Sequence, residues 1–312
     1  MEMKFRDKVL DTANREYVNT FWNAMHGRRD LLDTQEIGMD KGSGMHIMPI
    51  GSNQKFTNLM NAKSVFRGIA TVFETYDSSY KLLAKDCNDY TEWVPETGDI
   101  PIVEGAGDFT VTYSQVKKLA SIVKLESSFV YDMGFNVENY LIDRLSKTFA
   151  RGEDNGFING NGENAAFGIL HPEHGAETGR TTDSLTFDDI NALFFSVDPE
   201  YRTNGTWIMN DETALYLRSL KDDSGNYLWR GNEDNLLGRP VRISNFMPNA
   251  ESGNRPVAFG DFSYYWIIIR RPLLVKVLGE IFAMEGKIGY LATELLDGFL
   301  IRKSAVKTLD IN

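Results

Sequence analysis

Apolar residues recur every three or four positions in some segments of the chain and form short runs in others. Residues 14–25 show helical spacing, with one apolar stripe made of Tyr17, Val18, Phe21, Trp22 and Met25. Residues 38–51 are rich in Gly and Met, which predicts an extended arm with little core of its own, lying on another surface. A strand is expected at residues 65–73.

The strongest helical pattern covers residues 136–157. Asn136 can cap the helix, and its apolar positions follow at i, i+3 and i+4: Val137, Tyr140, Leu141, Leu145 and Phe149. Asn159-Gly-Asn-Gly162 ends it, because glycine readily adopts the left-handed backbone of a helix stop.

The second half of the chain mixes helices with strands. Thr186 and Asn210 each precede a helical pattern, with Ile190, Leu193, Phe194 and Val197 inward in the first and Leu217 and Leu220 in the second. Asp222-Asp-Ser-Gly225 is a turn signal. Strands are expected at residues 207–209, 241–244, 257–259, 264–269, 273–278, 287–296 and 300–309. The predicted fold class is α+β.

Residues 85–109 form an acidic and aromatic excursion. The acids are Asp86, Asp89, Glu92, Glu96, Asp99, Glu104 and Asp108, and the segment also contains Tyr90, Trp93, Val94 and Ile100. Glycines and prolines argue against a helix, and the strand-like flanks at 71–83 and 109–116 predict a long two-stranded hairpin. Because an isolated ribbon is marginally stable in water, its apolar residues imply a partner surface. A plain acidic surface loop is the alternative.

Composition narrows the function classes. The 312 residues are 42% hydrophobic, 25% charged and 12% aromatic, as in an ordinary folded protein. A formal net charge of -11 argues against a surface that grips nucleic acid through its phosphates, but not against a wall that encloses DNA. Cys87 is the only cysteine, so an intrachain disulfide is excluded and a reducing compartment fits. The longest apolar run, residues 264–269, is too short to span a bilayer, and no signal peptide is recognised.

Candidate catalytic and metal-binding residues have little support. His171 and His174 are spaced like metal ligands, but a proline lies between them and no third ligand is marked. Neither a phosphate-binding loop nor a nucleophile elbow is present. Residues 222–226 lack the ligands of a calcium loop. The pair Glu153-Asp154 is interpreted as a solvated helix end rather than an acid and base. We therefore expect no catalytic, cofactor-binding or metal-binding residues.

Several short motifs, in order and spacing, resemble the major capsid proteins of tailed bacteriophages over essentially the whole chain. They are Arg15-Glu-Tyr-Val-Asn-Thr-Phe-Trp22, Lys124-Leu-Glu-Ser-Ser-Phe-Val-Tyr-Asp132, Glu153-Asp-Asn-Gly-Phe-Ile-Asn-Gly-Asn-Gly162, Gly168-Ile-Leu170, Trp207-Ile-Met-Asn210, Leu220-Lys-Asp222, Gly225-Asn-Tyr-Leu228, Leu237-Gly-Arg-Pro-Val241 and Phe259-Gly-Asp-Phe262. Each piece is weak by itself, and their combination is specific.

The resemblance implies the phage major capsid protein fold in four parts. These are an N-terminal arm (1–63), an extended β-hairpin loop (85–109), a peripheral domain (64–157 with return strands 273–296) built on a spine helix (136–157), and an axial α/β domain (159–272 with 300–312). Such subunits form pentamers and hexamers that close an icosahedral shell around double-stranded DNA, without sequence-specific binding. The implied location is the virion capsid, assembled in the host cytoplasm, with a portal and a scaffold or protease as assembly partners.

Two departures from the family pattern affect assembly. No scaffolding segment precedes the arm, which predicts a processed form, a trimmed one or a separate scaffold. Some members join a loop lysine to an asparagine near the late peripheral strands. Lys85 lies at the base of the loop here, but Phe282-Ala-Met-Glu-Gly-Lys-Ile288 contains no asparagine, so a non-covalent shell is expected.

The acidic excursion leads to a hypothesis about subunit contacts. We expect Glu92, Glu96 and Asp99 to lie against basic residues of a neighbouring subunit, with Trp93 as the apolar anchor. The basic candidates are Lys117, Lys118, Arg144, Lys147 and Arg151. Two other functions stay open: an encapsulin-like bacterial shell that encloses cargo protein, and a hydrolase with an unmarked carboxylate site.

Overall fold

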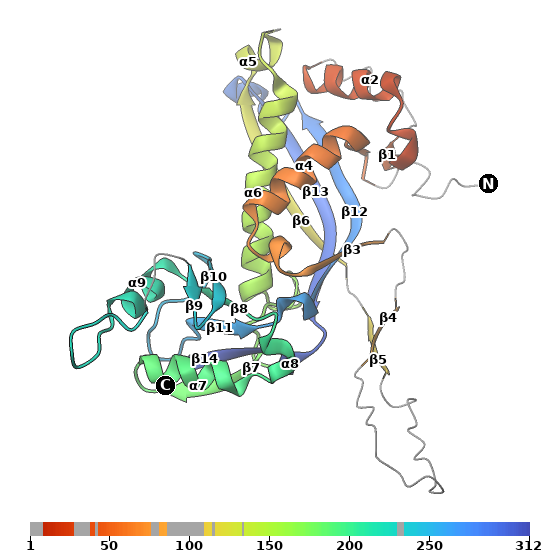
Figure 1. The fold of residues 1–312 in the computed structure, drawn as a ribbon. Coiled ribbons are helices and arrows are strands. Elements are labelled where there is room, and N and C mark those ends of the chain that lie inside the picture. The colour runs from red at the N-terminus through yellow and green to blue at the C-terminus, as the bar shows by residue number, and fades with distance from the viewer. Residues whose placement is uncertain are drawn as a thin grey trace, which may run out of the picture.

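Two six-stranded sheets form the framework of the computed structural model (Figure 1). The structure describes residues 9–27, 38–40, 43–75, 116–132, 134–229 and 234–312, and the backbone of residues 81–85 and 109–113. The first sheet has the order β1-β2-β12-β13-β6, with β3 also paired to β12. The second has the order β7-β14-β11-β8-β10-β9.

The first sheet is built around two long antiparallel strands. Its strands are β1 (Met39–Asp40), β2 (Met45–Ile47), β3 (Thr71–Glu74), β6 (Lys117–Glu126), β12 (Tyr265–Leu278) and β13 (Lys287–Leu300). β13 lies between β12 and β6, and the pairing with β6 runs without a break from Lys287↔Glu126 to Leu296↔Lys117. β3 runs parallel to β12, at its start.

Helices cover this sheet in two layers (Figure 1). They are α2 (Arg15–Met25), α4 (Ile50–Lys63), the 3-10 turn η1 (Phe66–Gly68), α5 (Ser127–Tyr131) and α6 (Val137–Asn159). α6 packs on β6 and β13, and α4 packs on α6. Phe21, Phe56 and Phe149 lie in their common core. The Asn136 side chain accepts a hydrogen bond from the backbone N–H of Asn139, as expected of a cap.

The second sheet comes from the residues that the sequence predicts to form the axial domain. Its strands are β7 (Glu177–Thr182), β8 (Thr206–Met209), β9 (Asn235–Leu236), β10 (Arg239–Ile243), β11 (Val257–Gly260) and β14 (Val306–Ile311). The helices here are α7 (Phe187–Ser196), α8 (Pro199–Arg202) and α9 (Asp211–Ser219), with the short turns η3 (Phe262–Tyr264) and η5 (Lys303–Ala305). A further turn, η4 (Ala283–Glu285), joins β12 to β13 of the first sheet. The rings of Trp207 and Phe259 stack at 4.2 Å in its core. Thr186 and Asn210 cap α7 and α9, as predicted.

A third core joins the two sheets. Phe66 is fully buried there, and its ring lies 5.3 to 5.9 Å from those of Phe157, Phe262 and Tyr265. The same core contains Ile208, Ala258 and Val306 of the second sheet and Ile267 of β12, so the two sheets share apolar contacts in one subunit.

The expected hairpin begins as a two-stranded ribbon. β4 (Lys81–Lys85) pairs antiparallel with β5 (Phe109–Tyr113), from Lys81↔Tyr113 to Lys85↔Phe109. Figure 1 shows this ribbon apart from both sheets. Glu92, Trp93, Glu96, Asp99 and Cys87 lie outside the described residues.

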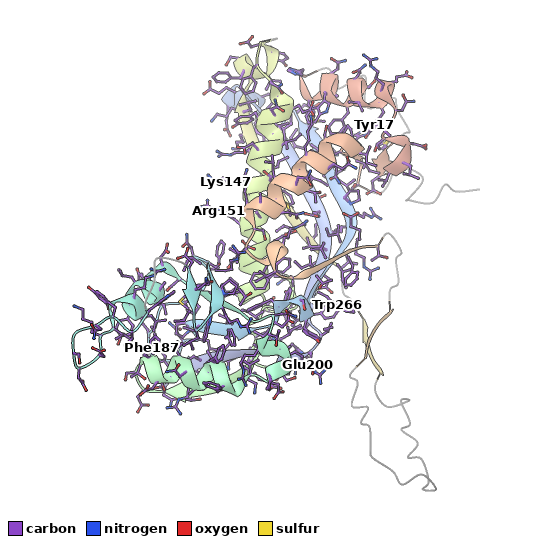
Figure 2. The ribbon with its side chains drawn as sticks, in the orientation of Figure 1. Tyr17, Lys147, Arg151, Phe187, Glu200 and Trp266 are labelled. Carbon is purple, nitrogen blue, oxygen red and sulfur yellow. The ribbon has the colours of Figure 1, made fainter. Side chains whose placement is uncertain are left out.

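The arm differs from the predicted extended segment with little core of its own. Tyr17 and Phe21 of α2 are almost fully buried (Figure 2 labels Tyr17), and the Tyr17 hydroxyl donates to the carbonyl of Ile47 at 2.6 Å. Residues 50–63 form α4, which was not predicted. The apolar face of α2 is therefore buried within its own subunit.

Other element boundaries also differ from the sequence prediction. The strand expected at 65–73 is the turn η1 followed by β3, and β6 was not predicted. Residues 264–269 and 273–278 belong to one strand, β12, whose register shifts near Arg271. The proposed domain boundary at residue 272 therefore lies within a continuous strand. In the described part of the chain, no helix is long and apolar enough to cross a membrane.

Candidate functional site

The exposed side of α6 carries a row of basic residues. Arg144, Lys147 and Arg151 are three and four positions apart and exposed, whereas Leu145 and Phe149 on the opposite side are buried. Lys147 and Arg151 lie about one turn apart, as Figure 2 shows. Within the described residues, none of the three makes an ion pair. The helix thus presents unpaired positive charge on a chain that is acidic overall.

A hollow of about 400 Å³ lies beside this row. Lys63, Asp143, Lys147, Ala150 and Arg151 line it. Lys63 Nζ donates to Asp143 Oδ1 at 2.6 Å, and this hydrogen bond, with the lysine charge, lowers the pKa of the Asp143 carboxyl. Since Asp143 is paired with Lys63, Lys147 and Arg151 give the hollow a net positive charge.

The other two basic candidates begin β6. Lys117 Nζ donates to the carbonyl of Glu163 at 2.8 Å, while Lys118 is exposed. Both line a smaller hollow of about 60 Å³ together with Gly152 and Gly156 of α6. A Cβ on Gly152 would lie 3.1 Å from Leu119 Cδ1, so a glycine here lets β6 approach the helix closely. The structure thus brings all five predicted basic residues to α6 or to the strand packed on it.

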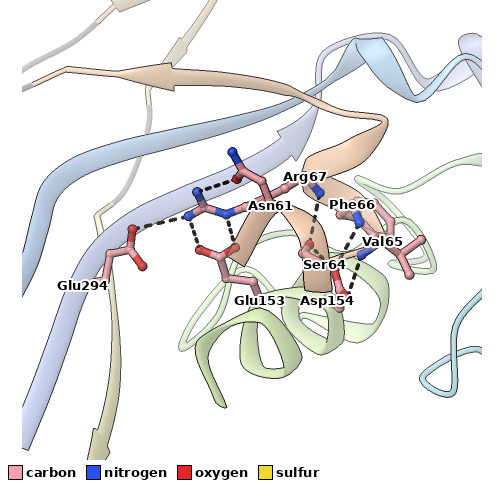
Figure 3. Close-up of polar contacts among 8 residues, drawn as sticks. All are labelled: Asn61, Ser64, Val65, Phe66, Arg67, Glu153, Asp154 and Glu294. Carbon is pink, nitrogen blue, oxygen red and sulfur yellow. Dashed lines mark hydrogen bonds and ion pairs between the residues drawn. The ribbon is translucent and has the colours of Figure 1, made fainter. Parts of the chain in front are cut away.

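A buried ionic cluster joins η1, α6 and β13 (Figure 3). Arg67 of η1 donates from Nε to Glu153 Oε2 at 2.6 Å and from Nη2 to Glu153 Oε1 at 2.7 Å. Nη2 also lies 3.4 Å from Glu294 Oε1 of β13, and Nη1 lies 3.5 Å from Asn61 Oδ1. One arginine therefore holds carboxylates of α6 and β13.

Burial and the charges of the partners together set the pKa shifts in the cluster. Burial would lower the pKa of Arg67, but the charge of Glu153 and its hydrogen bonds raise that pKa overall. Burial raises the pKa of Glu153, opposed by Arg67, and raises the pKa of Glu294 to about 8, helped by the negative charge of Glu153.

The neighbouring acid has a structural role. Asp154 accepts hydrogen bonds from Ser64 Oγ at 2.7 Å and from the backbone N–H groups of Val65 and Phe66 at 3.0 and 3.1 Å. These bonds satisfy the start of the η1 turn and fix it on α6. Burial raises the pKa of Asp154, and the hydrogen bonds oppose that shift.

The prediction that Glu153 and Asp154 form a solvated helix end is therefore wrong. Their residues are 2% and 5% exposed. A sequence signal was available, because Glu153 stands four residues after Phe149 and four before Phe157, on the apolar stripe of the helix. Arg67 and Glu294 had no comparable local signal.

The remaining motifs with candidate chemistry organise loops. His171 Nδ1 accepts from the backbone N–H groups of Glu173 and His174 at 3.1 and 3.0 Å, which holds that turn. Asp222 Oδ1 accepts from the N–H groups of Ser224 and Asn226, as expected of a turn. Over the described residues, no group of three or more His, Cys, Asp or Glu side chains is placed to hold a metal ion.

Comparison with known proteins defines the class of this fold. The model of the Phage capsid family matches residues 48–311, and the chain belongs to that family. It is a structural capsid-shell protein with the phage major capsid protein fold.

Solved capsid structures share the architecture. The capsid of an empty GTA particle is 25% identical with a TM-score of 0.68, covering 80% of this chain and 90% of that one. The capsid of a native GTA particle is 26% identical with a TM-score of 0.63, covering 79% and 89%. The structure from Microbacterium phage Oxtober96 is 15% identical with a TM-score of 0.54, covering 80% and 91%, and shows the fold alone. No curated protein matches the chain.

Proposed function

We propose that this chain is a major capsid protein that self-assembles as pentamers and hexamers into a closed icosahedral shell around double-stranded DNA. The observation that carries the proposal is the family match over residues 48–311 together with the shared fold of the GTA particle capsids. The net charge of -11 supports a wall that encloses DNA without binding it tightly. A portal and a scaffold or protease would take part in assembly in the host cytoplasm.

Two features of the chain support association with copies of itself. The ribbon β4–β5 stands apart from both sheets and continues into the acidic residues 86–108 (Figure 1). The row Arg144, Lys147 and Arg151 has no ion-pair partner among the described residues. In a heterologous contact the hairpin of one subunit would lie on the basic row of the next, with Lys117 and Lys118 beside it.

The free energies of ion pairing and of apolar burial differ in size, so charged and apolar side chains would have different roles at this contact. An exposed ion pair contributes only about 0–1 kcal/mol, so Glu92, Glu96 and Asp99 would mainly fix register and partner choice. Burial of a large aromatic side chain contributes more, and Trp93 would therefore supply most of the binding energy.

Trp93→Ala is expected to impair assembly more than Glu92→Gln does. The tryptophan variant loses buried apolar area, whereas the glutamine variant loses one exposed charge. Yields of sedimenting particles at equal protein concentration give the comparison. Equal yields from the two variants would rule out an apolar anchor at Trp93.

The receiving side of the same contact has a matched pair of variants. Lys147→Glu should lower particle yield at low salt, whereas Arg218→Glu, which makes the same change in net charge and leaves the α6 row intact, should not. Arg218 is an exposed cation on α9, in the axial part, paired with Asp234 at 2.8 Å. An identical loss from both charge reversals would show a nonspecific effect of net charge.

The encapsulin-like alternative predicts a different content. Such a shell would hold cargo protein, whereas the proposed capsid would hold nuclease-protected double-stranded DNA.

A further inference from the structure

The buried cluster on η1, α6 and β13 contains more acid than base. Arg67, Glu153 and Glu294 have side chains that are at most 4% exposed. One guanidinium therefore stands against two carboxyl groups at a site that water does not screen. An uncompensated buried charge is costly, so one of the two acids must hold a proton or disrupt the site.

The contact geometry identifies which acid is neutral. Both oxygens of Glu153 accept from Arg67, at 2.6 and 2.7 Å, which is the bidentate geometry of an ionised pair. Glu294 has one longer contact of 3.4 Å through Oε1, and its Oε2 is buried without a hydrogen-bond partner among the described residues. Glu153 is therefore the ionised partner, and Glu294 is the group that holds the proton.

Charges on neighbouring elements point the same way. Glu153 of α6 and Glu74 of β3 each raise the pKa of Glu294, after the larger effect of burial, and Arg67 opposes them. Asp154, also on α6, adds a further carboxyl close to Glu153.

The strands paired with β13 on either side, β6 and β12, carry other basic side chains near Glu294 in the strand register. On β6, Lys118 is exposed and Lys117 donates to the carbonyl of Glu163. On β12, Arg271 pairs with Asp40 at 3.0 Å, and Arg270 is buried beside the register shift. Within the described chain, Arg67 is the only base that forms an ion pair with Glu294.

We propose that Glu294 is protonated at neutral pH in the folded subunit, and that its ionisation loosens the clamp by which Arg67 holds the base of the hairpin on α6 and β13. Arg67 lies in η1, which leads directly into β3 and then into β4 of the ribbon. A second negative charge inside the clamp would compete with Glu153 for Arg67 and draw water into the site. The contacts that hold η1, and with it the base of the hairpin, on α6 and β13 would then weaken as the pH rises.

The direction of the pH dependence follows from proton linkage. In the unfolded chain Glu294 loses its proton near its ordinary pKa of 4.5, but in the folded subunit it holds the proton up to about pH 8. Between these two values the folded state binds one more proton than the unfolded state, so stability falls with rising pH. Each pH unit in this window changes the unfolding equilibrium by about tenfold per proton.

Urea unfolding of the full chain, measured at several values from about pH 5 to about pH 9, tests the inference. Glu294→Gln replaces the carboxylic acid by a neutral group of the same shape. In this variant the slope of the free energy of unfolding against pH is expected to be smaller by the equivalent of about one proton. The variant should also be at least as stable as the parent above about pH 8. Glu285→Gln, on the same β12–β13 hairpin but exposed, should leave the part of the slope between about pH 6 and pH 8 unchanged.

Infrared spectroscopy provides a readout independent of stability. The carbonyl band of a protonated carboxylic acid should be present in the parent at neutral pH and absent from Glu294→Gln. A parent without this band, or a Glu294→Gln variant that is destabilised with an unchanged pH slope, would overturn the proposal by showing that Glu294 is an ionised partner of Arg67.

Discussion

Arg67→Ala is expected to lower the free energy of unfolding by about 3–5 kcal/mol, because it leaves the buried Glu153 carboxylate without its counter-charge. Arg67 makes both hydrogen bonds to Glu153 and the contact to Glu294 at the same time. Denaturant unfolding of the purified, unassembled subunit provides the measurement.

An exposed ion pair provides the control for Arg67. Lys55 Nζ lies 3.2 Å from Glu138 Oε1, and the lysine side chain is 62% exposed. Lys55→Ala should cost only about 0–1 kcal/mol. If Arg67→Ala were equally mild, the buried cluster would not hold η1, α6 and β13 together.

Phe66→Ala is expected to cost about 3–5 kcal/mol in the same assay. Its ring is fully buried against Phe157, Phe262 and Tyr265, so its removal leaves a cavity where the two sheets meet. The transition should remain cooperative, because the other two cores keep their contacts.

Leu215→Ala is the matched surface control for Phe66. Leu215 is 70% exposed on α9, and its truncation should change stability by no more than about 0.5 kcal/mol. A Phe66→Ala cost as small as that of Leu215→Ala would show that the two sheets do not depend on this shared core.

Elements with a strong local pattern could be predicted from the sequence. The spine helix has an Asn136 cap and a continuous apolar stripe, and the structure confirms it as α6. Thr186 and Asn210 likewise predicted the starts of α7 and α9, because a side chain able to cap a helix precedes each apolar pattern. The match to the phage capsid family confirms the class that the ordered motifs indicated.

Elements that depend on distant partners could not be predicted. α4 has few buried apolar positions, chiefly Phe56 and Met60, and its stability comes from packing on α6. β6 starts with two lysines, which gives little local strand signal. Its pairing with β13 over ten residues stabilises it as a strand. The Arg270-Arg271-Pro272 interruption divided β12 into two predicted strands, although pairing with β13 continues past it.

The candidate site divides in the same way. The sequence named Arg144, Lys147 and Arg151 as basic candidates, and the structure places all three on the exposed side of α6. The buried cluster joins Arg67 to residues 86 and 227 positions away, and such contacts have no local signature. That the acidic hairpin meets the basic row in a neighbouring subunit stays a prediction.

The central claim is that many copies of this chain assemble into a closed shell. Electron microscopy of the purified protein at high concentration tests it most directly. We predict closed icosahedral particles with capsomers of five and six subunits. Isolated monomers at every concentration and salt condition would contradict the account.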